Sequence, residues 1–236
     1  DVIDLFRDHY QGTEFDLTQG LVAGPFGNPN RYSGSSRLIK GSWERALSIF
    51  RCEYVFVSQV RDWLPDPVGG VIWWGAAAPH DVVLVPLYCG ITDVPDAFDT
   101  GSLEKFDRDV ASWALNFMGN WAELKWSYMY PEIQAFQKKT EGKLFAMQPA
   151  IEAAAAQLYA VDPELCKEFL TDYVADVTDR VMAETWEFNE YLITKYRDGY
   201  ISIPRVGASA GYPDEWLKEV GYADGHIFGP DGYKAK

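Results

Sequence analysis

Residues 50–90 constrain the fold of this chain more than any other stretch. They contain three runs rich in Val, Ile, Tyr, Phe and Trp, at residues 54–60, 71–74 and 82–88, and clusters of Pro, Gly and Asp separate the runs. β-branched and aromatic runs divided by turn residues are typical of an antiparallel sheet. The second and third runs are apolar almost throughout, so we expect them to be central strands.

The first run alternates between two faces. One face carries Tyr54, Phe56 and Ser58, and the other carries Val55, Val57 and Gln59. Both faces are partly apolar, so we expect both to be covered, as in the middle layer of a sandwich.

A helical array is expected at residues 103–200. Apolar side chains recur at helical spacing between 103 and 130, and we interpret them as a core-facing stripe: Phe106, Val110, Trp113, Phe117, Trp121, Leu124 and Tyr128. Ser102 is the expected start of this helix, and Pro131 and Pro149 should begin or kink the next segments.

A further helix should begin at Asp162-Pro-Glu, because an acidic cap followed by proline is a common start. It should run to about Tyr196. Its expected buried stripe is Leu170, Val174, Val177, Val181, Phe188 and Leu192. The opposite row is expected to be a solvated face and not a metal site: Glu168, Asp172, Asp176, Asp179, Glu187 and Glu190.

The whole chain, residues 1–236, is interpreted as a single α+β domain segment. Residues 1–50 are expected to form a helix and a loop. The loop, at 11–36, is rich in Gly and Pro, and it either wraps a neighbouring element or lines a pocket. Residues 51–90 form the strands and 103–200 the helices. Residues 201–236 form an extended tail with a short helix near 214–220.

The charge of the chain excludes some partners. Its 35 acidic residues outnumber its 21 Lys and Arg residues, which gives a formal net charge of −14. Such a chain is poorly suited to nucleic acid or an anionic membrane surface, and we expect neither as a partner. No apolar run of about 18 residues or more suggests a spanning helix.

The chemical motifs are few. The sequence has no Gly-rich nucleotide loop, no His-Glu-x-x-His and no Gly-x-Ser-x-Gly, and its cysteines lack metal-ligand spacing. We expect no cofactor and no metal. Cys52 and Cys89 fall on neighbouring predicted strands and either form a disulfide or, with Cys166, are small buried hydrophobes. His9 is interpreted as a packed or capping residue, and His80 as a histidine of a surface turn.

Several long segments resemble one family of enzymes. They are residues 7–18 (RDHYQGTEFDLT), 23–31 (AGPFGNPNR), 56–75 (FVSQVRDWLPDPVGGVIWWG), 85–88 (VPLY), 106–109 (FDRD) and 113–121 (WALNFMGNW). These segments are similar to the cysteine dipeptidase family that includes bacterial dipeptidase A and the secernins. The resemblance covers roughly residues 1–200 and corresponds to the C-terminal half of the family pattern.

The resemblance implies an N-terminal-nucleophile hydrolase with a four-layer αββα sandwich. In that class, a cysteine at the mature N-terminus attacks the substrate and its own α-amino group serves as base. This chain begins with Asp1, so no catalytic residue is carried over to it. We expect the nucleophile on an upstream segment that completes the domain, a homo-oligomer, short peptides as substrates and no activity from this chain alone. The alternative is a non-catalytic peptide-binding or structural protein. Relatives with and without secretion signals leave a secreted, lysosomal or cytoplasmic location open.

Four residues are candidates for substrate binding: Gln59, Arg61, Trp63 and Trp74. The Arg61 guanidinium suits a dipeptide carboxylate, although it could equally fix the loop that holds Asp62 and Asp66. The two tryptophans either form an apolar pocket wall or fill the core.

Overall fold

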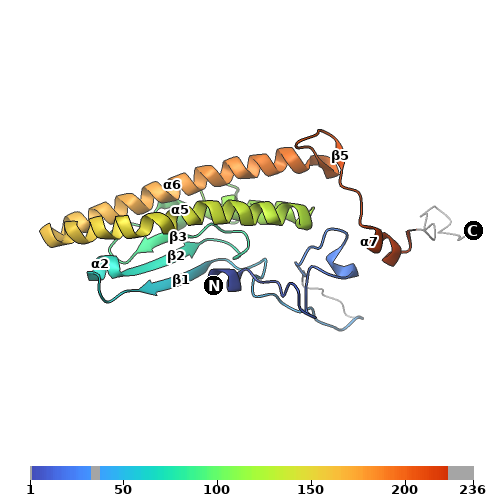
Figure 1. The fold of residues 1–236 in the computed structure, drawn as a ribbon, viewed down its shortest axis with the longest axis horizontal. Coiled ribbons are helices and arrows are strands. Elements are labelled where there is room, and N and C mark those ends of the chain that lie inside the picture. The colour runs from blue at the N-terminus through green and yellow to red at the C-terminus, as the bar shows by residue number, and fades with distance from the viewer. Residues whose placement is uncertain (1, 33–37, 223–236) are drawn as a thin grey trace, which may run out of the picture.

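The computed structural model describes residues 2–32 and 38–222 of the chain. Within them it contains a small antiparallel sheet and two long helices (Figure 1). The helices are α1 (Val2–Phe6), α2 (Asp66–Gly69), α3 (Asp96–Asp99), α4 (Ala111–Ala122), α5 (Trp126–Val161), α6 (Pro163–Tyr196) and α7 (Asp214–Glu219), with 3-10 turns η1 (Leu21–Ala23) and η2 (Arg197–Gly199). The strands are β1 (Val55–Val60), β2 (Gly70–Gly75), β3 (Val85–Tyr88), β4 (Tyr200–Ile201) and β5 (Ala208–Ser209). The prediction of a mixed helix and sheet chain is therefore confirmed.

The main sheet has the order β1-β2-β3, and both strand pairs are antiparallel. Val57 lies opposite Trp73, and Trp73 lies opposite Pro86. Of the two strands expected to be central, only β2 is central in the described residues. The third run contributes β3 at the other edge, and its first residues, 82–84, precede the strand.

The strand β1 is more exposed than its sequence predicted. Only Val55 is buried, whereas Phe56 is 48% and Val60 82% exposed. The expectation that both faces of this run are covered is wrong for the described residues. The face shared by Phe56 and its cross-strand partner Trp74 points away from the helices.

The two long helices lie side by side along one face of the sheet (Figure 1). Trp73 of β2 contacts Phe145 of α5, with ring centroids 4.3 Å apart, and Tyr88 of β3 faces Tyr173 of α6. The largest apolar core lies between these layers.

The helix α6 follows the prediction. The Asp162 side chain accepts a hydrogen bond from the Glu164 amide, and Pro163 occupies the first helical position. The expected apolar stripe is buried, except that Phe188 is half-buried. The predicted acidic row is exposed, and α7 lies where a short helix was expected.

The breaks expected at the two prolines are absent. α5 is continuous over 36 residues with Pro131 and Pro149 inside it. Each proline removes one backbone hydrogen bond. Buried side chains lie on both sides of each proline: Met129 and Ile133 around the first, Leu144 and Ala155 around the second. Tertiary packing of this kind supplies most of the stability of a helix in a protein, and it outweighs the local loss.

The helix expected from Ser102 begins later. α4 starts at Ala111, and Ser102 instead forms an isolated bridge with Lys105. The buried face of α4 consists of Ala111, Ala114, Leu115, Met118, Gly119 and Ala122. The predicted stripe is largely half-buried or exposed, because α4 packs closely through its small residues and turns its aromatic side outward.

The Gly/Pro-rich loop wraps the junction of α4 and α5, as expected. The Phe26 carbonyl accepts a hydrogen bond from the Ser127 amide, and the Lys125 ammonium lies 4.0 Å from the centre of the Phe26 ring. Asn30 and Tyr32 both bond to Glu123. Residues 33–36 of this predicted loop, and the tail after residue 222, lie outside the described residues.

No helix in the described part of the chain combines the length and hydropathy needed to cross a membrane.

Candidate functional site

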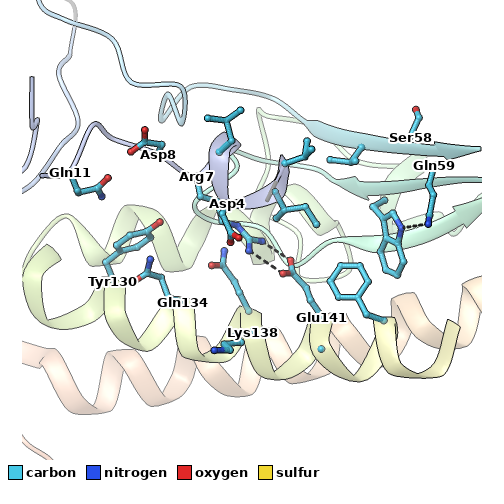
Figure 2. A pocket seen from close by; sticks show the side chains of 18 residues that line it. Asp4, Arg7, Asp8, Gln11, Ser58, Gln59, Tyr130, Gln134, Lys138 and Glu141 are labelled. Atoms are coloured by element: carbon cyan, nitrogen blue, oxygen red, sulfur yellow. Dashed lines mark hydrogen bonds and ion pairs between the residues drawn. The ribbon is translucent and has the colours of Figure 1, made fainter. Parts of the chain in front are cut away.

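A cleft of about 1360 Å³ lies between α1, the strands β1 and β2, and α5 (Figure 2). We call it the α1–α5 cleft. Its lining residues are Val2, Ile3, Asp4, Leu5, Arg7, Asp8, Gln11, Val57, Ser58, Gln59, Trp73, Tyr130, Gln134, Gln137, Lys138, Glu141, Gly142 and Phe145. A volume of this size exceeds that of most small-molecule pockets, and it suits a short peptide.

The floor of the cleft is one stripe of α5. Tyr130, Gln134, Gln137, Glu141 and Phe145 follow one another at spacings of three or four residues, which places them on a single helical face. The stripe changes character along its length. It is polar from 130 to 141 and apolar at 145.

An ion pair joins the wall of the cleft to this floor. Arg7 donates to both carboxylate oxygens of Glu141, at 3.0 and 2.6 Å. Its other bonds go to the carbonyls of Pro79 and Val82, and Glu141 also accepts from the Leu84 amide. Arg7 and Glu141 thus satisfy each other, and together they hold the N-terminal segment against α5.

Two polar groups of the floor are buried. Gln137 is 1% exposed and donates its amide protons to the carbonyls of His80 and Val82, at 3.0 and 2.8 Å. Tyr130 is 5% exposed and stacks on Trp126 with ring centroids 4.5 Å apart. Burial raises the pKa of the Tyr130 phenol, so it keeps its proton at neutral pH.

The apolar end of the cleft lies where Trp73 meets Phe145. Gln59 borders this end, and its side-chain oxygen accepts from the Gln148 amide at 3.0 Å and from the Trp73 indole at 3.5 Å. Among the four residues predicted to bind substrate, Gln59 is the one that lines the α1–α5 cleft.

The structure places Arg61 outside the cleft. It is 5% exposed, and it donates to the carbonyls of Gly69 and Val68 at 3.0 and 2.9 Å. Its remaining nitrogen lies 2.7 Å from the Glu152 carboxylate. The guanidinium therefore fixes the turn at 68–69 to α5.

The two predicted tryptophans also lie away from the cleft. Trp63 is 76% exposed in the turn after β1. Trp74 lies on the opposite face of the sheet and stacks on Tyr54 at 5.0 Å. The structure thus does not bring the four predicted residues together.

A second cluster contains Ser48, His80 and Asp81, and all three are buried. The Ser48 hydroxyl lies 2.6 Å from His80 Nδ1, and His80 Nε2 lies 3.1 Å from the Asp81 carboxyl without an aligned hydrogen bond. The interpretation of His80 as a surface turn residue is therefore wrong. Residues 82–85, which come just after His80 in the sequence, are hydrophobic and buried in the core, so His80 is buried beside them.

Burial shifts the pKa values of both groups of this contact toward the neutral forms. Burial lowers the pKa of His80 well below its ordinary value, and the nearby His9 acts in the same direction. Burial, aided by the Glu123 carboxylate, raises the pKa of Asp81 well above its ordinary value. The cluster has the residue types of a hydrolytic triad, but Ser48 is only 1% exposed, so we interpret the cluster as structural.

His9 is packed in the same core, as expected. Its ring lies 4.9 Å from that of His80 and 5.4 Å from that of Trp126. Burial lowers its pKa to about 4.

The three cysteines are separate and unpaired. Cys52 precedes β1 and Cys89 follows β3, and β2 lies between these strands, so the expected neighbouring-strand pair is absent. Only Cys166 is a buried hydrophobe; Cys89 is exposed and Cys52 donates to the Tyr54 carbonyl. Among the described residues, the hydrogen bonds join no cysteine to a histidine.

The described residues contain no group of three or more His, Cys, Asp or Glu side chains that could hold a metal ion.

Apart from Gln59, the polar residues that line the cleft were not predicted from the sequence. Arg7 and Glu141 are 134 positions apart, and nothing in the sequence pairs them. The polar stripe at 130, 134, 137 and 141 did carry a signal. Its helical spacing crosses Pro131, where a new helix was expected to begin.

Comparison with known protein families finds a match. The sequence model described as Peptidase family C69 matches residues 1–139. A search of curated proteins returned no match. The matched residues include the wall of the cleft, the main sheet and the polar part of the floor up to Lys138.

Proposed function

Because the chain belongs to peptidase family C69, we propose that it is the C-terminal portion of a cysteine dipeptidase that hydrolyses short peptides. The family match carries the peptidase assignment. The α1–α5 cleft supports a peptide as ligand, since it offers a polar and an apolar end within one elongated space.

The nucleophile belongs to an upstream segment in this proposal. A cysteine nucleophile needs a base or a lowered pKa. Burial instead raises the pKa of Cys166, and the Cys52 thiol is engaged with a carbonyl. An N-terminal cysteine needs no histidine, because its own α-amine has a pKa near neutrality.

The proposed reaction has two steps. The thiolate attacks the peptide carbonyl carbon, and a thioester forms as the amine leaves with a proton. Water then cleaves the thioester, releasing the carboxylic acid and regenerating the thiol. This chain supplies the cleft that positions the peptide, and by itself it is inactive.

The upstream segment is expected to bind at the main sheet. β1 is an edge strand of the main sheet in the described residues, and Phe56 and Val60 lie exposed on or beside its outer face. A second sheet packed on that face, with α5 and α6 on the other, gives the αββα arrangement of an N-terminal-nucleophile hydrolase. Covering this face also buries the exposed Phe56 side chain.

The test begins with intact-mass and N-terminal analysis of native material. We expect a second polypeptide that begins with cysteine, in equal amount, and dipeptide hydrolysis that iodoacetamide abolishes. Hydrolysis by the isolated 236-residue chain would contradict the proposal. A native single species that binds peptides without cleaving them would instead establish the alternative, a non-catalytic peptide-binding protein.

A further inference from the structure

Two polar contacts cross the α1–α5 cleft and bound a section of it. The first is the ion pair between Arg7 and Glu141. The second is the hydrogen bond from the Gln148 amide of α5 to the Gln59 side-chain oxygen of β1, at 3.0 Å. Glu141 and Gln148 are seven residues apart, which is about 10 Å along a helix. Figure 2 shows the Arg7–Glu141 pair and Gln59 at the two ends of this section, which we call the aromatic section.

The second contact is held by further polar groups. The Gln148 amide also donates to the Glu152 carboxylate at 2.7 Å. That carboxylate lies 2.7 Å from the Arg61 guanidinium, which in turn donates to the carbonyls of Val68 and Gly69. Linked polar contacts of this kind hold one another in place. This end of the aromatic section is therefore fixed before any ligand binds.

The floor of the aromatic section is apolar. The ring of Phe145 on α5 lies 4.3 Å from that of Trp73 on β2, measured between centroids. Phe145 lines the cleft and is 38% exposed, so part of its ring is open to a ligand. Trp73 is only 3% exposed. The pair thus forms an aromatic surface of which Phe145 is the accessible part.

The rim beside Phe145 is open. Gly142 precedes Phe145 by about one helical turn and also lines the cleft. A side chain built on Gly142 would meet no atom within 4 Å, and the backbone does not require glycine there, because its φ is not positive. Glycine in a helix loses more conformational freedom on folding than alanine does. This position therefore costs stability, and it leaves the approach to the Phe145 ring clear.

We propose that the aromatic section is a specificity pocket for a large apolar side chain of a peptide, and that Phe145 is the residue that selects this side chain. The inference rests on the proposed function in taking a peptide as the ligand. It adds a preference among peptides and names the residue responsible. Gly142 and Phe145 follow residues 1–139, the segment that the family model matches, so the match gives neither of them a role.

The chemistry of the aromatic section suits a phenylalanine or tryptophan side chain. Contact with the Phe145 ring removes apolar surface from water, and aromatic pairs gain stability beyond that area. A charged side chain would lose hydration beside the two rings. The ion pair at the end of the section is already satisfied within the chain. The methyl group of an alanine residue is too small to cover much of the aromatic surface.

The test compares two probes by isothermal titration calorimetry on the full 236-residue chain. N-acetylphenylalaninamide and N-acetylalaninamide both lack charged ends, so they differ only in the side chain. We expect the phenylalanine probe to bind about tenfold more tightly or better, the effect of burying part of a phenyl ring. Equal affinities, tighter binding of the alanine probe, or no binding of either would overturn the inference.

Phe145→Ala is the decisive variant. It removes the accessible ring, so the phenylalanine probe should bind about tenfold more weakly, while binding of the alanine probe changes little. Met147→Ala is the matched control, because Met147 is 39% exposed on the same helix and does not line the cleft. An unchanged affinity in Phe145→Ala, or an equal loss in both variants, would contradict the proposal.

Phe145→Leu keeps the test valid if the alanine variant does not fold. Leucine retains an apolar side chain that can pack against Trp73, and it favours a helix. The variant should still prefer the phenylalanine probe, with a smaller margin than the parent chain, because the contact between aromatic rings is lost. Urea midpoints of all three variants establish that each is folded. A margin equal to that of the parent chain would remove Phe145 from the assignment.

The outcome is separable from that of the proposed function. If the probes behave as expected and no partner with an N-terminal cysteine exists, the specificity pocket stands and the dipeptidase proposal fails. If the assembled enzyme hydrolyses alanine and phenylalanine dipeptides with equal kcat/KM, and Phe145→Ala changes neither value, the enzyme stands and the specificity pocket fails.

Discussion

His9 and His80 place their imidazole rings in contact in the core, where burial lowers the pKa of both. Each ring must lose its proton to be buried, since a charged group in an apolar site loses its hydration. Asp81 has the opposite requirement and is buried with its proton. This small region therefore couples folding to pH in two opposing directions.

We predict that stability falls as the pH is lowered from about 6.5 toward 4. The folded pKa of His9 is about 4, below its ordinary 6.5, and that of His80 is lowered too. The unfolded chain therefore binds more protons in this range, and the stabilisation present above pH 6.5 is lost. For His9 alone the full loss is on the order of 3 kcal/mol. Urea midpoints followed by tryptophan fluorescence measure it.

Asp81→Asn provides the control. Because the pKa of Asp81 is raised, its proton stabilises the fold below pH 3.8, and this contribution is lost as the pH rises. From pH 3.8 up to its raised pKa, this contribution opposes that of the histidines. The variant should therefore lose stability more steeply on acidification than the parent chain. If the urea midpoint changes with pH in neither the parent chain nor the variant, the histidines are not buried as neutral groups.

The sequence predicted the packing of His9 but not that of His80. Its neighbours Pro79 and Asp81 are turn formers, and this local signal suggested a surface turn. Tertiary contacts decide where His80 lies. The Gln137 side-chain amide holds the turn in the core by donating hydrogen bonds to the carbonyls of His80 and Val82. His80 and Gln137 are 57 residues apart, so no local sequence pattern reveals this contact.

At the scale of elements, the small residues of α4 allow its close approach to the residues around Asp81. A side chain at Gly119 would overlap the Asp81 carboxyl group. Asn189 of α6 donates to the Ala114 carbonyl from the other side. The helix is thus held on two sides by polar groups, and its aromatic residues remain at the periphery.

Gly119→Ala should destabilise the chain by about 1–3 kcal/mol or more, because the buried Asp81 must move to admit the methyl group. Gly142→Ala is the matched control. It lies within α5 with open space around its Cα, and alanine there should stabilise the helix by roughly 0.5–1 kcal/mol. Chemical denaturation of the two variants gives the comparison. Equal effects would mean that α4 does not pack against Asp81 as described.

The sequence specified the capped helix α6 but not the limits of α4 and α5. Asp162-Pro-Glu is a local signal, and the structure uses it. Pro131 and Pro149 are local signals as well, yet packing overrides them. The spacing of the aromatic residues predicted the wrong core face for α4. The helix packs closely through its alanines and its glycine, and its tryptophans lie at the periphery.

At the scale of the molecule, the main sheet has one face against α5 and α6 and an outer face that includes Phe56 and Trp74. The stacked rings of Tyr54 and Trp74 continue this outer surface. An exposed aromatic surface beside an edge strand favours association, which the net charge of −14 opposes.

We predict that the isolated chain associates in a concentration-dependent manner and that Phe56→Lys suppresses the association. Phe56 is 48% exposed, so its replacement should change the free energy of unfolding by only about 0.5 kcal/mol. Sedimentation velocity at several concentrations measures the effect. Phe15→Lys is the control, since Phe15 is similarly exposed, at 53%, but lies in the wrapping loop. A monomer at all concentrations, or equal effects of both substitutions, would argue against a role for the outer face.

The order of strands and helices along the chain could be predicted from the sequence, whereas the cleft could not. Strand runs and capped helices depend on neighbours in sequence. The cleft depends on where α1 lies against α5, which is set by Arg7 reaching the Glu141 carboxylate and the carbonyls of Pro79 and Val82.

That same link has a consequence for how the chain folds. Arg7 and Glu141 are separated by 134 residues, so the wall and the floor of the cleft meet only after most of the chain has been gathered into one loop. Closing so long a loop costs entropy, and such contacts form slowly compared with local ones. The helices and the hairpin can form first, whereas the cleft is complete only once this long-range contact has formed. The presence of the cleft therefore reports that two segments far apart in the sequence, those of Arg7 and Glu141, have come together.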